Sequence, residues 1–184
     1  MLRKGERTLM KKETIYLAGG CYWGTEKFLA SLQGVTQTEV GFANGFVKAP
    51  SYDTVKHTET GHAETVHVTY DDKELPLEML LELFYNIIDP TSLNKQGLDV
   101  GKQYRTGIYT VDDADLAVAR RSLEKLQTRF DKPVVVECQP LDCFYTAEEY
   151  HQKYLDRNPN GYCHVSLGMI QKAKAWKPGD PTTL

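Results

Sequence analysis

Short strand-like and helix-like patterns follow one another from about residue 14 to residue 170, and no low-complexity linker or internal repeat interrupts them. A chain of 184 residues can bury one substantial hydrophobic core without disulfide staples. We therefore expect a single domain over residues 1–184, with its core at about 14–170 and a polar N-terminal extension over 1–13.

Hydrophobic periodicity predicts both strands and helices within this core. In the clearest strand, at residues 64–70, Glu64 lies on the same face as the apolar side chains. Further strands are expected at 15–18, 35–41, 106–111 and 134–138, and helices at 26–32, 77–88, 116–130 and 146–154. The last helix is predicted from the capping-box pattern Thr146-Ala147-Glu148-Glu149. This irregular alternation predicts an α+β fold, a two-layer sandwich with helices packed against one sheet.

Charge and hydropathy exclude two classes of partner. The 22 basic and 25 acidic residues give a net charge of −3 without a long basic run, so we expect no nucleic-acid partner. The charged N-terminal segment lacks a signal-peptide pattern, and the sequence contains no run of eighteen apolar residues. We therefore expect a cytoplasmic protein without a membrane partner.

The chain contains four cysteines, too few to indicate a disulfide scaffold in a chain of this length: Cys21, Cys138, Cys143 and Cys163. In a reducing cytosol such thiols are catalytic, metal-binding or inert. Their spacing matches no common zinc pattern. A zinc-binding interaction domain that uses Cys138, Cys143, Cys163 and His164 is one alternative function.

Cys21 is the leading candidate nucleophile. It lies between glycines and aromatic residues in Gly19-Gly20-Cys21-Tyr22-Trp23-Gly24, directly after a predicted strand. A following helix would direct unpaired backbone N–H groups at the sulfur and lower the pKa of the thiol below its free value of ~8.5. Because Gly24 stands three residues after Cys21, a Cys-x-x-Cys pair is excluded. The alternative is a small buried thiol without chemistry.

Glu64 is the candidate general acid. Burial on an apolar strand face would raise the pKa of its carboxyl and favour the protonated form. A protonated carboxyl could then give a proton to the oxygen of a substrate whose neighbouring atom Cys21 attacks. A paired carboxylate, or a strand-end glutamate in solvent, is an equally weighted alternative.

Other candidates lie in loops. Tyr52 and Tyr104 lie in loops that contain glycine or proline, and their hydroxyls can hydrogen-bond a polar oxygen. A second enzyme class, a cysteine acyl-transfer enzyme, would instead activate Cys21 through His62 or His151. Cys163 follows a turn-rich segment and suits a resolving role, in which it attacks a sulfenic acid on Cys21 to form a disulfide.

Several of these segments resemble one family, the A-type peptide methionine sulfoxide reductases, and the resemblance extends from about residue 15 to 167. It is carried by Gly20-Cys21-Tyr22-Trp23-Gly24, Gly61-His62-Ala63-Glu64 and Gly101-Lys102-Gln103-Tyr104-Arg105-Thr106, with Pro50-Ser51-Tyr52, Tyr150-His151-Gln152 and Asn160-Gly161-Tyr162-Cys163 in the same order. It implies a ferredoxin-like plait with a mixed, mainly antiparallel sheet, packed helices and a long C-terminal coil.

The resemblance also implies a site and a reaction: thiol-dependent reduction of methionine-S-sulfoxide, free or in oxidised proteins, as protein repair under oxidative stress. The implied catalytic residues are Cys21, Glu64, Tyr52, Tyr104 and Cys163, and the implied substrate-binding residues are Tyr22, Trp23 and Asp99. Cys21 would become a sulfenic acid, which Cys163 resolves. We expect a monomer that binds no metal and no organic cofactor, with thioredoxin, or dithiothreitol in vitro, as the reductant.

Three departures from the family pattern matter. Tyr22 replaces a commoner phenylalanine and adds a hydroxyl that must find a partner or water, and Phe42 stands where many members have tyrosine. No cysteine follows Cys163, although some members use one to relay the disulfide outward. We therefore expect a direct transfer from the Cys21–Cys163 disulfide to thioredoxin, with the participation of Cys143 or Cys138 left open.

Overall fold

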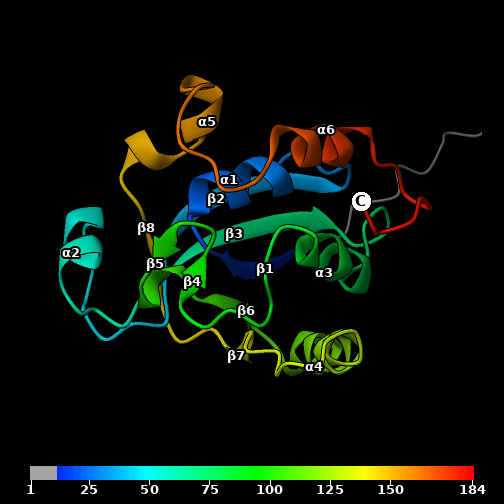
Figure 1. Cartoon of the computed structure of the whole chain (residues 1–184), viewed down its shortest axis with the longest axis horizontal. Helices are drawn as coiled ribbons and strands as arrows, with labels where there is room; N and C mark the ends of the chain where they lie inside the picture. The colour runs from blue at the N-terminus through cyan, green and yellow to red at the C-terminus, as the bar shows by residue number, and fades with distance from the viewer. Residues whose placement is uncertain (1–11) are drawn as a thin grey trace, which may run out of the picture.

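The computed structural model describes residues 12–184, and the statements below concern that part of the chain. Of the expected N-terminal extension, residues 1–11 lie outside the described residues. A six-stranded sheet in the order β7-β6-β1-β3-β2-β8 forms the centre (Figure 1). Only β6 and β7 pair in parallel, so the sheet is mixed and mainly antiparallel, which confirms that part of the prediction.

The four central strands are β1 (Lys12–Gly19), β2 (Val35–Ala43), β3 (Ala63–Asp71) and β6 (Thr106–Thr110). β3 lies between β1 and β2, with Leu17 opposite Val66 and Phe42 opposite Glu64. Because β1 and β3 are antiparallel, the chain leaves β1 beside the start of β3. This pairing brings the turn after Gly19 next to Glu64.

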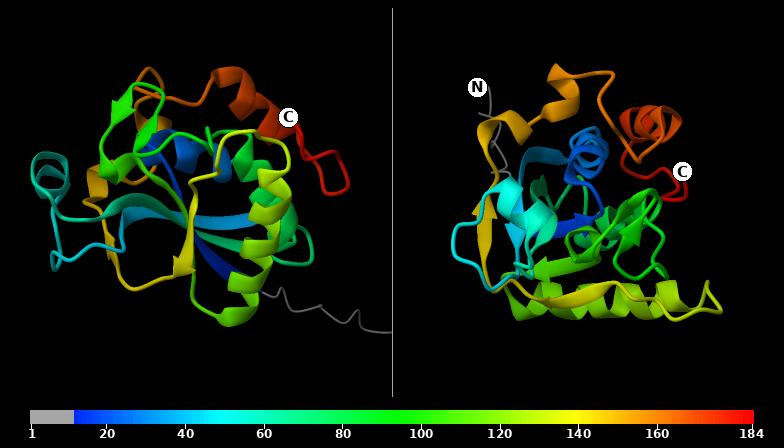
Figure 2. Two further views of the ribbon diagram at one scale, coloured as in Figure 1. Left: turned by 60° about the horizontal axis from the view of Figure 1, so that its bottom comes forward. Right: turned by 60° about the vertical axis from the view of Figure 1, so that its left-hand side comes forward.

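The remaining strands are short. β7 (Glu137–Pro140) and β8 (Phe144–Thr146) form the two edges of the sheet. β4 (Lys95–Gln96) and β5 (Asp99–Val100) make a separate two-stranded hairpin. The views in Figures 1 and 2 place this hairpin on the same side of the molecule as the helix α2 (Tyr52–His57).

Helices pack around the sheet. α1 (Tyr22–Leu29) and α6 (Leu167–Ala175) lie above the sheet in Figure 1, and α4 (Asp113–Gln127) lies below it beside α3 (Leu77–Tyr85). The buried core joins these layers with the side chains of Leu17, Phe28, Val40, Val66 and Phe84. Shorter helical segments are η1 (Lys102–Tyr104), η2 (Glu149–His151) and α5 (Tyr154–Arg157). Within residues 12–184, no helix has the length and apolar character needed to cross a membrane.

The buried face predicted at residues 64–70 is confirmed, because the side chains of Glu64, Val66, Val68 and Tyr70 are all buried. On the opposite face His67 and Thr69 are partly exposed, as the alternation predicts, but Thr65 is buried. The helix predicted at 26–32 begins four residues earlier, at Tyr22. The strand predicted at 134–138 begins only at Glu137.

The helix predicted at 146–154 is wrong. Thr146 ends β8, a 3-10 turn follows, and Lys153 has a left-handed backbone with φ of 52°. Long-range partners outweigh the local capping pattern: the side chain of Gln152 bonds both Val40 N and Val40 O, at 2.8 and 2.9 Å. Because η2, α5 and α6 interrupt the C-terminal segment, the long C-terminal coil is not confirmed.

Candidate active site

Cys21 occupies the N-cap position of α1, immediately after β1. Gly20 makes the turn with φ of +88°, a conformation that favours glycine. The hydroxyl of Thr25 donates to the carbonyls of Gly19 and Cys21, both at 3.1 Å, and this fixes the junction between strand and helix. The side chain of Cys21 is buried. The sequence prediction of a cysteine at a strand-to-helix turn is therefore confirmed.

Glu64 lies beside this turn. Its Oε2 accepts a hydrogen bond from the backbone N–H of Tyr22 at 3.1 Å, the first residue after Cys21. Burial raises the pKa of the Glu64 carboxyl to about 8, although the hydrogen bond from Tyr22 opposes the shift, and nearby Asp99 adds to it. At neutral pH the carboxyl is therefore mainly protonated and can act as a proton donor, in line with the sequence argument from burial.

The pKa of the Cys21 thiol is raised well above its usual value, first by burial and next by the negative charge of Glu64. The backbone N–H groups of Trp23 and Gly24 act in the opposite direction, as expected at a helix N-terminus. Desolvation outweighs them, so the predicted lowering of the pKa of Cys21 below its free value is wrong. Burial therefore favours the thiol form of Cys21, and protonation of Glu64 removes one of the effects that oppose its ionisation.

Two phenols lie near this pair. Tyr52 begins α2, where its backbone N–H donates to Glu148 Oε1 at 2.9 Å, and Tyr104 ends η1. Both rings are partly buried. The pKa of each hydroxyl is raised, first by burial and then by the charge of Glu64, with a smaller effect from Cys21. Both hydroxyls therefore remain protonated donors within electrostatic reach of the candidate nucleophile and acid.

Aromatic rings form a wall next to Cys21. Tyr22 is buried with its ring centroid 5.8 Å from Phe42. The indole of Trp23 stacks on Tyr154 at 3.7 Å and donates from Nε1 to His151 Nδ1 at 3.1 Å. The Tyr22 hydroxyl is buried without a hydrogen-bond partner among residues 12–184. The substitution of tyrosine for phenylalanine here thus leaves a polar atom unsatisfied.

The remaining two predicted residues are joined to the site by neighbouring contacts. Asp99 Oδ2 accepts a 2.7 Å hydrogen bond from the hydroxyl of Tyr162, the residue before Cys163. Cys163 Sγ donates to Val165 O at 3.0 Å. The same sulfur lies so close to Gly24 that a β-carbon added to this glycine would be 3.1 Å from it. Since Gly24 belongs to the first turn of α1, the structure brings Cys163 against the turn that Cys21 begins.

Three residues near the site were not predicted to belong to it: Glu148, Tyr162 and His164. Glu148 was assigned to a capping box, whereas its carboxylate holds Tyr52. His164 Nε2 is hydrogen-bonded to the carbonyl of Gly19 at 2.9 Å. Tyr162 belongs to the motif Asn160-Gly161-Tyr162-Cys163, and His164 was considered only as a zinc ligand. For Glu148 the only further signal in the sequence was its proximity to Tyr150-His151-Gln152.

The alternative functions find less support. His151 Nδ1 accepts from Trp23, and His62 Nε2 lies 4.0 Å from Cys143 Sγ, so both rings are engaged with residues other than Cys21. For zinc, residues 12–184 hold no group of three or more His, Cys, Asp or Glu side chains suited to a metal ion. Cys138 lies on β7, and its half-buried thiol packs against the core.

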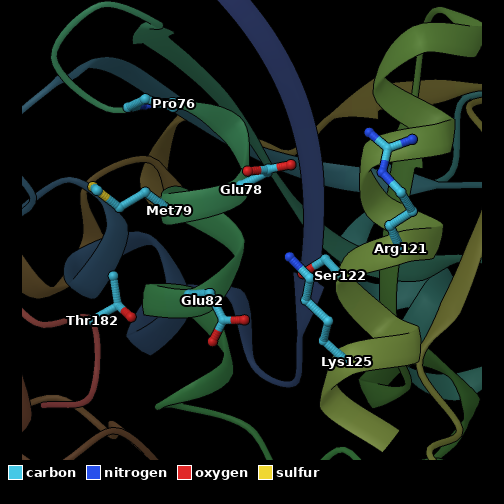
Figure 3. A pocket seen from close by; sticks show the side chains of 8 residues that line it. All are labelled: Pro76, Glu78, Met79, Glu82, Arg121, Ser122, Lys125 and Thr182. Carbon is cyan, nitrogen blue, oxygen red and sulfur yellow. The ribbon is translucent and has the colours of Figure 1, made fainter.

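Two cavities of the structure differ in their positions relative to the predicted site residues. One of about 590 Å³ lies between α5 and α6 and is lined by Cys163, Leu155, Val165 and Ile170. The other, of about 340 Å³, lies between α3 and α4, where Glu78, Glu82, Arg121 and Lys125 line it (Figure 3). None of the predicted site residues lines this second cavity. Of these two cavities, only the first therefore lies next to a candidate redox residue, Cys163.

Comparisons with known proteins agree with this geometry. The model of a family described as peptide methionine sulfoxide reductase matches residues 13–179. The peptide methionine sulfoxide reductase MsrA of Lachnoclostridium phytofermentans is 56% identical over 162 residues, which are 88% of this chain and 98% of the relative. The MsrA of Clostridium perfringens strain 13 is 55% identical over 158 residues, covering 86% and 99%.

Solved structures show the same similarity. The reduced form of Mxr1 from Saccharomyces cerevisiae has a TM-score of 0.80 and 38% identity, covering 85% of this chain and 92% of that chain. Methionine sulfoxide reductase A of Corynebacterium diphtheriae has a TM-score of 0.77 and 37% identity, covering 85% and 80%. Mxr1 in complex with Trx2 has a TM-score of 0.57 and 25% identity, covering 83% and 91%.

Proposed function

Because the chain belongs to the peptide methionine sulfoxide reductase family, we propose that it reduces methionine-S-sulfoxide, free and in proteins, at the site built on Cys21 and Glu64. The observation that supports this most directly is the hydrogen bond from Tyr22 N to Glu64 Oε2 at 3.1 Å. It holds a buried, mainly protonated carboxyl beside the N-cap cysteine. An acid and a nucleophile in this arrangement suit attack on sulfur coupled to protonation of oxygen.

In the proposed reaction, Cys21 Sγ attacks the sulfoxide sulfur as a thiolate while Glu64 gives its proton to the sulfoxide oxygen. This attack forms a bond between Cys21 Sγ and the substrate sulfur. The protonated oxygen then moves to Cys21 Sγ while the S–O bond of the substrate and the new S–S bond break, so that methionine leaves and Cys21 becomes a sulfenic acid. In the net reaction a thiol and a sulfoxide become a sulfenic acid and a thioether, so the proton that Cys21 loses replaces the one that Glu64 gives to the oxygen. This proton balance fits a resting state in which both groups are protonated.

The pocket residues have matching roles. We propose that the hydroxyls of Tyr52 and Tyr104, which burial keeps protonated, donate to the sulfoxide oxygen. Tyr22 and Trp23 would hold the S-methyl group, since both rings belong to the aromatic wall beside Cys21. Asp99 would line the polar side of the pocket.

We propose that Cys163 resolves the sulfenic acid as a disulfide, which a thioredoxin then reduces. The position of Cys163 against the first turn of α1 supports the first step. The solved complex of the similar protein Mxr1 with Trx2 supports the second. The cavity of about 590 Å³ beside Cys163 offers a path for the incoming thiolate, which must approach in line with the S–S bond so that Cys21 leaves.

The order of the central strands also bears on the fold class. The central order β6-β1-β3-β2, with α1 and α3 as crossovers, supports a ferredoxin-like plait. We propose one catalytic domain with its core at about 14–170, working as a cytoplasmic monomer without metal or bound organic cofactor.

Turnover of separated sulfoxide epimers with dithiothreitol tests the function. We expect the S epimer to be reduced, the R epimer to remain, and Cys21→Ser to lose all turnover. Reduction of the R epimer, or equal turnover by Cys21→Ser, would overturn the proposal. Purified Cys138→Ser serves as a matched control, because Cys138 lies on β7 at an edge of the sheet, and it should retain full turnover.

A further inference from the structure

We propose that His164 is the general base that removes the proton from the Cys163 thiol when this thiol attacks the sulfenic acid on Cys21. This inference rests on the proposed function, which supplies the sulfenic acid. In the step, a bond forms between the two sulfur atoms and the S–O bond on Cys21 breaks. The departing oxygen leaves as water and carries the proton that His164 has taken from Cys163. No outside oxidant or reductant enters.

The ring of His164 is held in one orientation. Its Nε2 lies 2.9 Å from the carbonyl oxygen of Gly19, which can only accept, so Nε2 carries the hydrogen. In the neutral ring, Nδ1 then carries the free lone pair. This Nδ1 atom is buried and has no hydrogen-bond partner among residues 12–184. The ring therefore presents an unused acceptor at the end of β1.

That acceptor lies close to the resolving thiol. A β-carbon on Gly24 would lie 3.0 Å from His164 Nδ1 and 3.1 Å from Cys163 Sγ, so the two atoms are separated by at most the sum of these distances. Because position 24 is a glycine, both atoms can occupy the same side of the first turn of α1. A rotation of the Cys163 side chain that breaks its hydrogen bond to Val165 O would free the thiol to give its proton to His164.

The protonation states are suited to the transfer. Burial raises the pKa of the Cys163 thiol, so this group needs a base near neutral pH. Burial lowers the pKa of His164, while the Gly19 carbonyl and the charge of Asp99 on β5 oppose that shift. The imidazole is consequently neutral at pH 7 and free to accept. His151, the other buried ring near the site, already uses its Nδ1 for Trp23.

His164→Gln separates chemistry from structure, because a glutamine amide can still donate to the Gly19 carbonyl but cannot accept a thiol proton. Reduced enzyme is mixed with one equivalent of methionine-S-sulfoxide without reductant. Methionine is measured by rapid quench, and disulfide formation is measured by loss of two free thiols. We expect an unchanged methionine burst, disulfide formation about a hundredfold slower at pH 7, and a sulfenic acid that dimedone traps. Added imidazole should restore part of the rate.

His57→Gln is the matched control, since His57 is an exposed residue of α2, and it should leave both steps unchanged. Disulfide formation by His164→Gln at the wild-type rate would overturn the proposal. A slow rate of disulfide formation in His164→Gln that neither imidazole nor higher pH restores would also overturn the proposal, because it would indicate that His164 has a structural role. Absence of a methionine burst in the wild-type protein would instead refute the proposed function.

If His164→Gln loses the methionine burst as well, the pH dependence of disulfide formation in the wild-type protein tests whether a histidine acts as the base. Because the His164 imidazole is already neutral at pH 7, a histidine base predicts a rate of disulfide formation that is nearly constant between about pH 7 and pH 8. A rate that rises tenfold per pH unit through this range, as for unassisted thiol ionisation, would contradict the proposal.

Discussion

The Tyr162 hydroxyl donates a 2.7 Å hydrogen bond to Asp99 Oδ2. Tyr162 precedes Cys163, and Asp99 belongs to the β4–β5 hairpin, so this bond joins the segment of the candidate resolving cysteine to the candidate substrate pocket. We therefore predict that this one side-chain contact couples substrate binding to disulfide formation.

Removing the hydrogen bond between Tyr162 and Asp99 should weaken substrate binding. For Tyr162→Phe we expect KM for methionine-S-sulfoxide to rise about threefold to tenfold, because a hydrogen bond to a charged group contributes about 1 kcal/mol at a partly exposed site. Steady-state kinetics with dithiothreitol measures this change. Tyr150→Phe, which alters another exposed tyrosine, should leave KM unchanged. Equal effects of the two substitutions would show that the Asp99 bond has no special role.

Glu64→Gln should slow the formation of the sulfenic acid about a hundredfold, because the amide keeps the shape of the carboxyl but is not an acid. The wild-type rate should fall as pH rises above about 8, where Glu64 loses its proton. The variant should lack this decline. Stopped-flow or rapid-quench measurement of methionine release between pH 6 and 9 tests both statements, and an unchanged rate in the variant would refute the acid role.

The same carboxyl should make stability depend on pH. Its pKa in the folded protein, about 8, lies above the usual 4.5, so the folded state holds the proton more tightly than the unfolded state. The free energy of unfolding contributed by this group is complete below pH 4.5 and is lost as pH rises towards 8. Urea titrations at pH 5 and pH 8.5 should therefore show a larger decrease for the wild type than for Glu64→Gln.

Tyr22→Phe should stabilise the protein by about 1 kcal/mol, because it removes a buried hydroxyl that has no hydrogen-bond partner among the described residues. The aromatic wall remains, so reductase activity should be retained. Urea denaturation monitored by circular dichroism measures the change. A loss of stability would mean that the hydroxyl has a bonding partner in solution, such as a buried water.

Cys163→Ser should release about one methionine per enzyme from the sulfoxide in the absence of reductant and then stop with thioredoxin present. The sulfenic acid on Cys21 should be trapped by dimedone and detected by mass spectrometry. Cys143→Ser provides the comparison, since Cys143 contacts His62 and Gly45 rather than α1. Sustained thioredoxin-dependent turnover by Cys163→Ser would assign the resolving role to another thiol.

Local patterns in the sequence predicted the features that depend on neighbouring residues. The alternation that buries Glu64 and the turn that places Cys21 at a helix start are both of this kind. The errors lie where distant segments intervene. Gln152 binds β2 and prevents the helix predicted at 146–154, and desolvation by the surrounding fold raises the pKa of Cys21 against the effect of the helix. His164 was missed because its partner, Gly19, is 145 residues away in sequence.

Gly24 gives the first turn of α1 a bare backbone surface, and both Cys163 and His164 press against it. A methyl group there would push each of them outward by a few tenths of an ångström. We therefore expect Gly24→Ala to form the sulfenic acid on Cys21 as before but to form the disulfide with Cys163 more slowly. The absence of a side chain at position 24 would then matter for recycling of the protein rather than for its first reaction.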